Sequence, residues 1–196
     1  MASGSGIGDE AAAGGGSVVV VTGAASALGR RVCALAAADP AVSRVVGLDR
    51  RSSTEVVEGV RLQQLELATA DLKRAMEGAD VLVHLAQGEG LEPEPASGRG
   101  VGDGRLAQLV LDAASAVGIE HVVLLSSATA YGAWANNPVP LTEEAPLRPN
   151  PGVRFASEKA ELERVAADWR DDHPGATVAV LRPTVTAGDE GTGWLA

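Results

Sequence analysis

The sequence predicts an α/β domain of the doubly wound type, in which a parallel sheet lies between layers of helices. Apolar, β-branched runs alternate along the chain with amphipathic stretches, and this alternation is typical of parallel strands covered by helices. A chain of 196 residues is long enough for one such domain with a substantial core. Because 45% of the residues are apolar and only 3% are aromatic, we expect a core of Val, Leu and Ala.

The expected elements follow one another in regular order. Strands are expected at residues 17–22, 44–49, 60–65, 80–85, 121–126 and 177–182. Helices are expected at residues 27–38, 69–77, 103–117 and 153–171, with start or stop signals at Asp71, Gly78, Gly118 and Pro174. Long loops at residues 87–102 and 132–151 follow the carboxyl ends of strands, where parallel α/β folds bind their ligands.

The first 16 residues are mostly Gly, Ala and Ser. They contain too few large apolar side chains to order themselves, so we expect a disordered tail at 1–16 and the domain at 17–196. The tail lacks the basic start and apolar run of a signal peptide, and no apolar stretch reaches membrane-spanning length. The single cysteine, Cys33, cannot form an internal disulfide and is interpreted as a small buried hydrophobe. The expected location is therefore cytoplasmic.

The charge balance limits the expected partners. The formal net charge is −10 and the pI is about 4.7, a balance that repels nucleic acid and anionic membranes. Basic pairs nevertheless occur near the expected ligand site. We interpret them as solvated surface, with phosphate contacts as the alternative; they are Arg30, Arg31, Arg50 and Arg51.

The segment from Val18 to Arg31 carries the main functional signal. A β-branched run passes into a small-residue turn that contains Gly23 and Gly29, and then into a helix-forming stretch. Glycines permit a tight turn, and the following helix N-terminus offers N–H donors to a pyrophosphate. Asp49 ends the next apolar run about 20 residues further on, where a carboxylate binds an adenosine ribose. The segment predicts a dinucleotide site; the alternative is a strand-turn-helix corner without a ligand.

The turn departs from regular glycine spacing. Read with glycines three residues apart, it has Ser26 at the middle position. Read as Thr22-Gly-x-x-x-Ala27-x-Gly29, it has alanine where glycine or alanine is accepted. Either side chain places a Cβ atom near the phosphates, where it can weaken binding.

Later segments carry a resemblance to a known family. They are Asp80–Gln87 (DVLVHLAQ), His121–Gly132 (HVVLLSSATAYG), the proline-rich stretch from Pro140 to Pro149, and Leu181-Arg182-Pro183. With the glycine turn, they make the chain resemble the extended short-chain dehydrogenases/reductases, the group of NAD-dependent epimerases and dehydratases, from about residue 17 onward. The resemblance implies a Rossmann-type, three-layer α/β/α fold with strand order 3-2-1-4-5-6.

The resemblance also implies a cofactor and the residues that hold it. NAD is the expected cofactor, with NADP as the alternative, and no metal site is expected. Asp49 should accept the ribose hydroxyls and repel a 2′-phosphate, and Arg50 beside it could partly offset that repulsion. The expected cofactor contacts are Gly23, Ala25, Ser26, Ala27, Leu28, Gly29, Asp49, Arg50, Glu66, Leu67, Leu85, Ala86, Lys159 and Pro183.

The catalytic positions implied by the resemblance are incomplete. In this family a Tyr-x-x-x-Lys pair on a helix transfers the substrate proton, and a serine binds the substrate oxygen. Lys159 and Ser127 match that pattern, but Phe155 stands where the tyrosine is expected. Without the phenol we expect impaired proton transfer. Packing, structural or solvated roles are expected for the neighbouring polar residues Tyr131, His84, Ser126 and Ser157.

The chain also ends where the family's substrate portion is expected to begin, shortly after Pro183. The expectation is a chain without the C-terminal substrate domain, either a fragment or a protein completed by a partner in a homo- or hetero-oligomer. Three functions compete: an impaired NAD(P)-binding oxidoreductase or epimerase-like domain, a catalytically silent cofactor-binding or regulatory module, and a non-functional remnant. The first is preferred, and the substrate is unknown.

Overall fold

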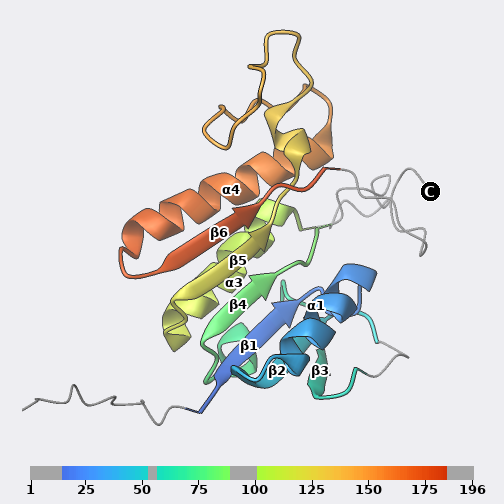
Figure 1. Ribbon diagram of the computed structural model, residues 1–196, viewed down its shortest axis with the longest axis vertical. Helices are drawn as coiled ribbons and strands as arrows, with labels where there is room; N and C mark the ends of the chain where they lie inside the picture. Colours follow the sequence, from blue (N-terminus) through green and yellow to red (C-terminus); the bar gives the residue numbers. More distant parts are fainter. Residues whose placement is uncertain (1–14, 53–56, 89–100, 185–196) are drawn as a thin grey trace, which may run out of the picture.

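The computed structural model describes residues 15–52, 57–88 and 101–184. One six-stranded sheet runs through the described part of the chain, with all neighbouring strands parallel (Figure 1). The strands are β1 (Ser17–Thr22), β2 (Val42–Asp49), β3 (Val60–Gln64), β4 (Val81–His84), β5 (His121–Leu125) and β6 (Thr177–Leu181). Their order is β3-β2-β1-β4-β5-β6, which confirms the predicted Rossmann-type topology.

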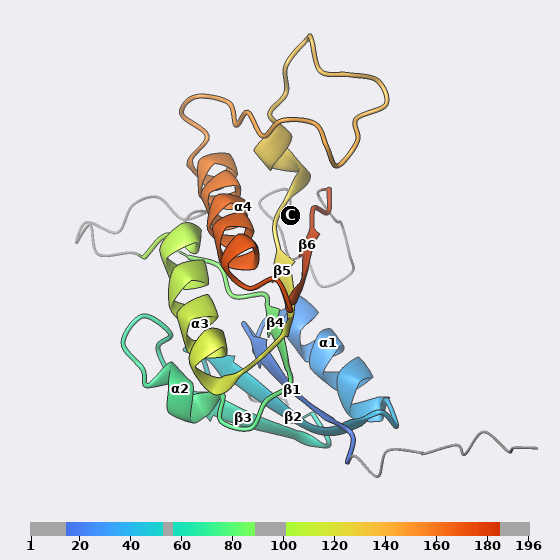
Figure 2. The same cartoon turned by 90° about the vertical axis from the view of Figure 1, so that its left-hand side faces the viewer.

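Helices cover both faces of this sheet. Figure 2 shows α1 (Ala27–Ala38) on one face, and α2 (Leu72–Ala75), α3 (Asp103–Val117) and α4 (Arg154–Asp172) on the other. A short 3-10 helix, η1 (Ala128–Tyr131), follows β5. The predicted three-layer arrangement is therefore confirmed.

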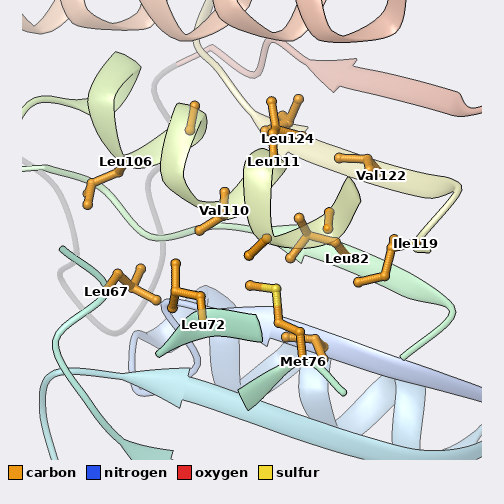
Figure 3. Packing of buried hydrophobic residues seen from close by; sticks show 14 of the residues in the cluster. Leu67, Leu72, Met76, Leu82, Leu106, Val110, Leu111, Ile119, Val122 and Leu124 are labelled. Carbon is orange, nitrogen blue, oxygen red and sulfur yellow. The ribbon is translucent and has the colours of Figure 1, made fainter. Parts of the chain in front are cut away.

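The core is built from small and aliphatic side chains on both sides of the sheet. Alternate residues of β1 serve the two sides: Val19 and Val21 pack on the α1 side, and Val20 packs on the other. The larger cluster lies against α2, α3 and α4, and Met76 and Leu82 within it are both fully buried (Figure 3). Cys33 is buried on the α1 side, as predicted, and burial raises the pKa of its thiol to about 11.

Two local predictions need correction. Strand β2 begins at Val42, two residues before the expected start, and α2 is one turn instead of the expected helix at 69–77. The helix is short because the carbonyl of Glu66 accepts hydrogen bonds from the N–H groups of Thr69 and Ala70, which folds that segment into a separate turn. Asp71 then starts α2 by accepting a hydrogen bond from the N–H of Arg74.

Some expectations fall outside the described residues. These are residues 1–14 of the expected tail and residues 89–100 of the first long loop. No described helix has both the length and the hydropathy needed to cross a membrane. Among the described strands, β6 pairs only with β5, and Leu181 on it is 50% exposed.

Candidate functional site

The turn after β1 needs glycine at both of its predicted positions. Gly23 has φ +73°, and a Cβ atom there would lie 2.7 Å from the backbone nitrogen of Ala86, just beyond β4. A Cβ atom on Gly29 would overlap the carbonyl oxygen of Gly23. Glycine at these two positions thus allows α1 to start directly against the carboxyl ends of β1 and β4.

The start of α1 has the form of an anion site. Ser26 caps the helix: its Oγ accepts a hydrogen bond from the N–H of Gly29 at 2.9 Å and donates to the carbonyl of Gly23 at 2.8 Å. The serine that interrupts the glycine spacing therefore has a structural task within the turn. By helix geometry the N–H groups of Ala27 and Leu28 have no intrahelical acceptor, so they are available to a pyrophosphate.

Asp49 lies at the end of β2, facing this turn. Its side chain is 4% exposed, and its Oδ2 accepts a hydrogen bond from the N–H of Ala25 at 2.9 Å. Oδ1 accepts from the backbone N–H and Nε of Arg51. Burial alone raises the pKa of Asp49, but the hydrogen bonds from Arg51 and Ala25 outweigh it and hold the pKa below its ordinary value. The carboxylate is thus held ionised at the expected ribose position.

The remaining predicted cofactor residues are distributed around the same edge of the sheet. Leu67 and Leu85 are buried in the core, whereas Leu28 at the start of α1 is 46% exposed. Ala86 donates its N–H to Thr22 Oγ1 at 3.3 Å. Glu66, Arg50 and Pro183 are exposed; the carbonyl of Pro183 accepts a hydrogen bond from the N–H of Ala128. Their contacts with a cofactor stay predictions.

Lys159 lies inside the domain beside Phe155. Its side chain is 0% exposed, and its ammonium forms an ion pair with Asp103 Oδ2 at 2.7 Å. The same Nζ donates to the carbonyl of Leu125, at the end of β5, at 3.2 Å. It also lies 5.4 Å from the centre of the Phe155 ring. The protein itself therefore uses two of the three ammonium protons.

Asp103 is the residue at this site that sequence reasoning missed. It is the first residue of α3, its side chain is 4% exposed, and its Oδ1 accepts a hydrogen bond from the N–H of Gly88. Glycines flank it: a Cβ atom on Gly102 would overlap the carboxylate of Glu158, and one on Gly104 would overlap Glu161. At Gly104 the overlap is with Cγ and Cβ of Glu161, close to the α4 backbone, so glycine at this position lets the start of α3 lie close to α4.

His84 is fully buried at the end of β4, and the structural role expected for it stays a prediction. Its Nδ1 lies 2.7 Å from Thr22 Oγ1, and its Nε2 has no hydrogen-bond partner among the described residues. Burial, together with the nearby Lys159 ammonium, lowers the pKa of His84 from 6.5 to about 4, although the Asp103 carboxylate opposes this. The ring is therefore neutral near pH 7.

A second polar network lies between η1, α4 and the end of β6. Arg182 donates to both carboxylate oxygens of Glu163, to Tyr131 Oη at 2.6 Å and to the carbonyl of Glu143 at 2.9 Å. Ser126 donates its hydroxyl to Glu163. Tyr131 thus connects η1 to Arg182, and Ser126 connects the end of β5 to α4, in line with the packing and hydrogen-bonding roles expected for them.

Ser127 caps η1. Its Oγ accepts hydrogen bonds from the N–H of Thr129 at 3.2 Å and from Thr129 Oγ1 at 3.0 Å. The side chain is 8% exposed and follows β5, whose last carbonyl binds Lys159. Ser127, Lys159 and Phe155 therefore gather at the carboxyl end of β5, whereas their catalytic roles stay predictions.

Comparisons with known proteins bear on this arrangement. The model of the NAD dependent epimerase/dehydratase family matches residues 19–193. Among solved structures, the chain is similar to MoeE5 in complex with UDP-glucose and NAD, with 25% identity and a TM-score of 0.66 over 83% of this chain and 52% of that one. Among curated proteins, none matches.

Two further structures share the fold. The UDP-Glc/GlcNAc 4-epimerase of Campylobacter jejuni is 18% identical, with a TM-score of 0.71 over 85% of this chain and 53% of that one. A tyrosine-to-phenylalanine mutant of the Bacillus cereus UDP-glucuronic acid 4-epimerase, in complex with a fluorinated UDP-sugar and NAD, is 20% identical, with a TM-score of 0.68 over 84% and 55%. The chain thus spans about half the length of these proteins. The predicted resemblance, and NAD as the cofactor of the family, are confirmed.

Proposed function

This chain belongs to the NAD-dependent epimerase/dehydratase family, and on that premise we propose that it binds NAD and has impaired proton transfer. When bound, the nicotinamide ring would accept and return a hydride. The chain's own residues hold the dinucleotide and orient it. The observation that carries the impairment is Phe155, whose ring lies 5.4 Å from the Lys159 ammonium.

The cofactor would lie across the carboxyl ends of β1, β2 and β4. The first N–H groups of α1 would bind the pyrophosphate, and the ionised Asp49 would accept the adenosine ribose hydroxyls. Arg51, which is 57% exposed, would turn away from Asp49 to admit them. The other proposed contacts are those given by the resemblance, from the glycine turn at 23–29 to Pro183.

The loss of the phenol acts on the chemical step. Phe155 and Lys159 are four residues apart on α4 and so lie on the same helix face. A phenyl ring keeps the shape of a tyrosine but has no proton to give or take. General acid–base catalysis by a positioned side chain contributes about 10²–10⁴-fold, so turnover is lowered by about that factor.

Calorimetric titration with NAD, NADP and their reduced forms tests the binding proposal. We expect Asp49→Ala to weaken NAD binding strongly. Asp39→Ala is the matched control, because Asp39 follows the far end of α1 and should leave NAD affinity unchanged. No heat of binding from any of the four nucleotides, with a folded chain, would refute the proposal.

We propose nucleotide sugars as the substrate class, supported by the likeness to structural relatives. MoeE5 is described with UDP-glucose and the Bacillus cereus protein as a UDP-glucuronic acid 4-epimerase, so nucleotide sugars are the first compounds to assay. A second candidate function is a catalytically silent cofactor-binding module that pairs with a partner. It is supported by β6, which pairs only with β5 among the described strands, because a strand edge left without a partner can pair with another chain. We place either activity in the cytoplasm, with residues 17–196 as the functional domain behind a tail at 1–16.

A further inference from the structure

The charge environment of Lys159 differs from what proton transfer at Phe155 would require. A lysine activates a neighbouring phenol by favouring its ionised form, and this needs an uncompensated positive charge within about 4–6 Å. Here the ammonium already has a carboxylate, Asp103, at 2.7 Å, and both side chains are almost wholly buried. The pair is therefore neutral as a unit.

The residues around Asp103 position its carboxylate for the ion pair with Lys159. Gly102 and Gly104 let the start of α3 approach α4, and the N–H of Gly88 holds the second carboxylate oxygen of Asp103. Asp103 also lies in the first turn of α3, where the helix dipole stabilises a negative charge. The glycines, the Gly88 N–H and the start of α3 thus all hold the Asp103 carboxylate against Lys159.

We propose that Asp103 is a positioning residue that cancels the charge of Lys159 and keeps its ammonium inside the domain, so that Phe155 and Asp103 together silence proton transfer. The inference rests on the proposed function, because it concerns the same site. It identifies Asp103, which is distant from Phe155 in sequence, as a second cause of impaired proton transfer.

The other groups near the ammonium do not restore its charge effect. His84, from β4, is neutral near pH 7 and so adds no positive charge. The carbonyl of Leu125, from β5, adds only a partial negative charge. Glu158, on α4 itself, is 3.7 Å from Arg154 and lies over Gly102, on the Asp103 side.

The test restores the phenol in two charge backgrounds. Phe155→Tyr alone should give a tyrosine with a pKa close to the ordinary value of about 10. Phe155→Tyr combined with Asp103→Asn should lower that pKa by about 1–3, because the lysine charge is then uncompensated. Asparagine keeps the size of the side chain and an oxygen acceptor for Lys159 or Gly88.

Ultraviolet absorbance of tyrosinate against pH measures both values. Tyr131 is the one tyrosine of the natural chain, so the curve of the parent with Phe155 is subtracted in each background. A merely structural Asp103 would change stability without moving the phenol pKa. The inference is overturned if the tyrosine titrates alike in both backgrounds, or if Phe155→Tyr alone already titrates well below the ordinary range.

The single variant keeps the test decisive even if Asp103→Asn does not fold, because Phe155→Tyr leaves the ion pair intact. The titration needs neither NAD nor substrate, so its outcome is separate from that of the nucleotide titrations. If a nucleotide sugar is turned over, the double variant should exceed Phe155→Tyr by about 10-fold or more, within the range of general acid–base catalysis.

Discussion

Replacing Asp103 by alanine should destabilise the fold severely, through one buried charge. The side chains of Lys159 and Asp103 are 0% and 4% exposed, so the variant leaves the ammonium buried without its counter-ion. Removing one member of a buried pair costs about 3–5 kcal/mol. That is a large part of the roughly 5–15 kcal/mol by which domains are stable. At about 2–4 °C per kcal/mol for a chain of this size, the melting temperature should fall by roughly 6–20 °C.

Urea unfolding followed by circular dichroism gives the free energy of unfolding. The second arm is Asp103→Ala with Lys159→Met, in which both charges are gone. The double variant should recover most of the lost stability, because a buried pair replaced by apolar groups is often neutral.

The matched control is Asp168→Ala in the exposed pair that Arg164 forms with Asp168. Its N–O distance of 2.6 Å is as short as that of the buried pair, but the side chains are 59% and 65% exposed. Its unfolding midpoint should stay unchanged, since solvent screens exposed pairs. A cost below about 1 kcal/mol for Asp103→Ala, or a double variant no more stable than Asp103→Ala alone, would refute the reasoning.

Three further changes have defined outcomes. Arg51→Ala should weaken NADP more than NAD in calorimetry, because Arg51, which binds Asp49, adds its positive charge to that of Arg50 near the expected 2′-phosphate position; equal losses would contradict this. Because burial lowers the pKa of His84 to about 4, the unfolded chain binds the proton first, so stability should fall as the pH drops from about 6.5 to about 4. The loss reaches about 3 kcal/mol, and it should be missing from His84→Gln when urea midpoints are compared across pH. Leu181→Lys should reduce self-association in sedimentation over a concentration series, because it places a charge on the exposed β6 edge; a wild-type chain that stays monomeric throughout would argue against that edge as an interface.

The sheet could be predicted because its signals are local. The residues Val19–Val21 are buried on both faces of the sheet, and a β-branched run of this kind is typical of a parallel strand. The strand order came from the family resemblance, since alternation of strands and helices alone does not fix it. The shortness of α2 could not be predicted, because the residues before it, Ala68–Ala70, favour a helix that the turn at Glu66 prevents.

The site could be predicted only where neighbours in sequence are neighbours in space. Gly23 and Gly29 lie in one turn, and Asp49 follows that turn at the sequence distance expected for a residue that binds the ribose. Asp103 looked like an ordinary acidic residue at a helix start, and nothing in its own segment indicated that Lys159 lies opposite. The glycines on both sides of it were the available signal, because they mark a place where another backbone or side chain approaches closely.

The hydrogen bonds of Arg182 couple the loop that follows η1 to the helix α4. One guanidinium holds a loop carbonyl, that of Glu143, and the Glu163 carboxylate. Glu163 lies one helical turn beyond Lys159, which lies one turn beyond Phe155. A molecule that pulled on the loop would therefore also pull on the helix that carries the lysine, with no hinge between them. Binding of a molecule at the loop would then be coupled to the position of the Lys159 ammonium.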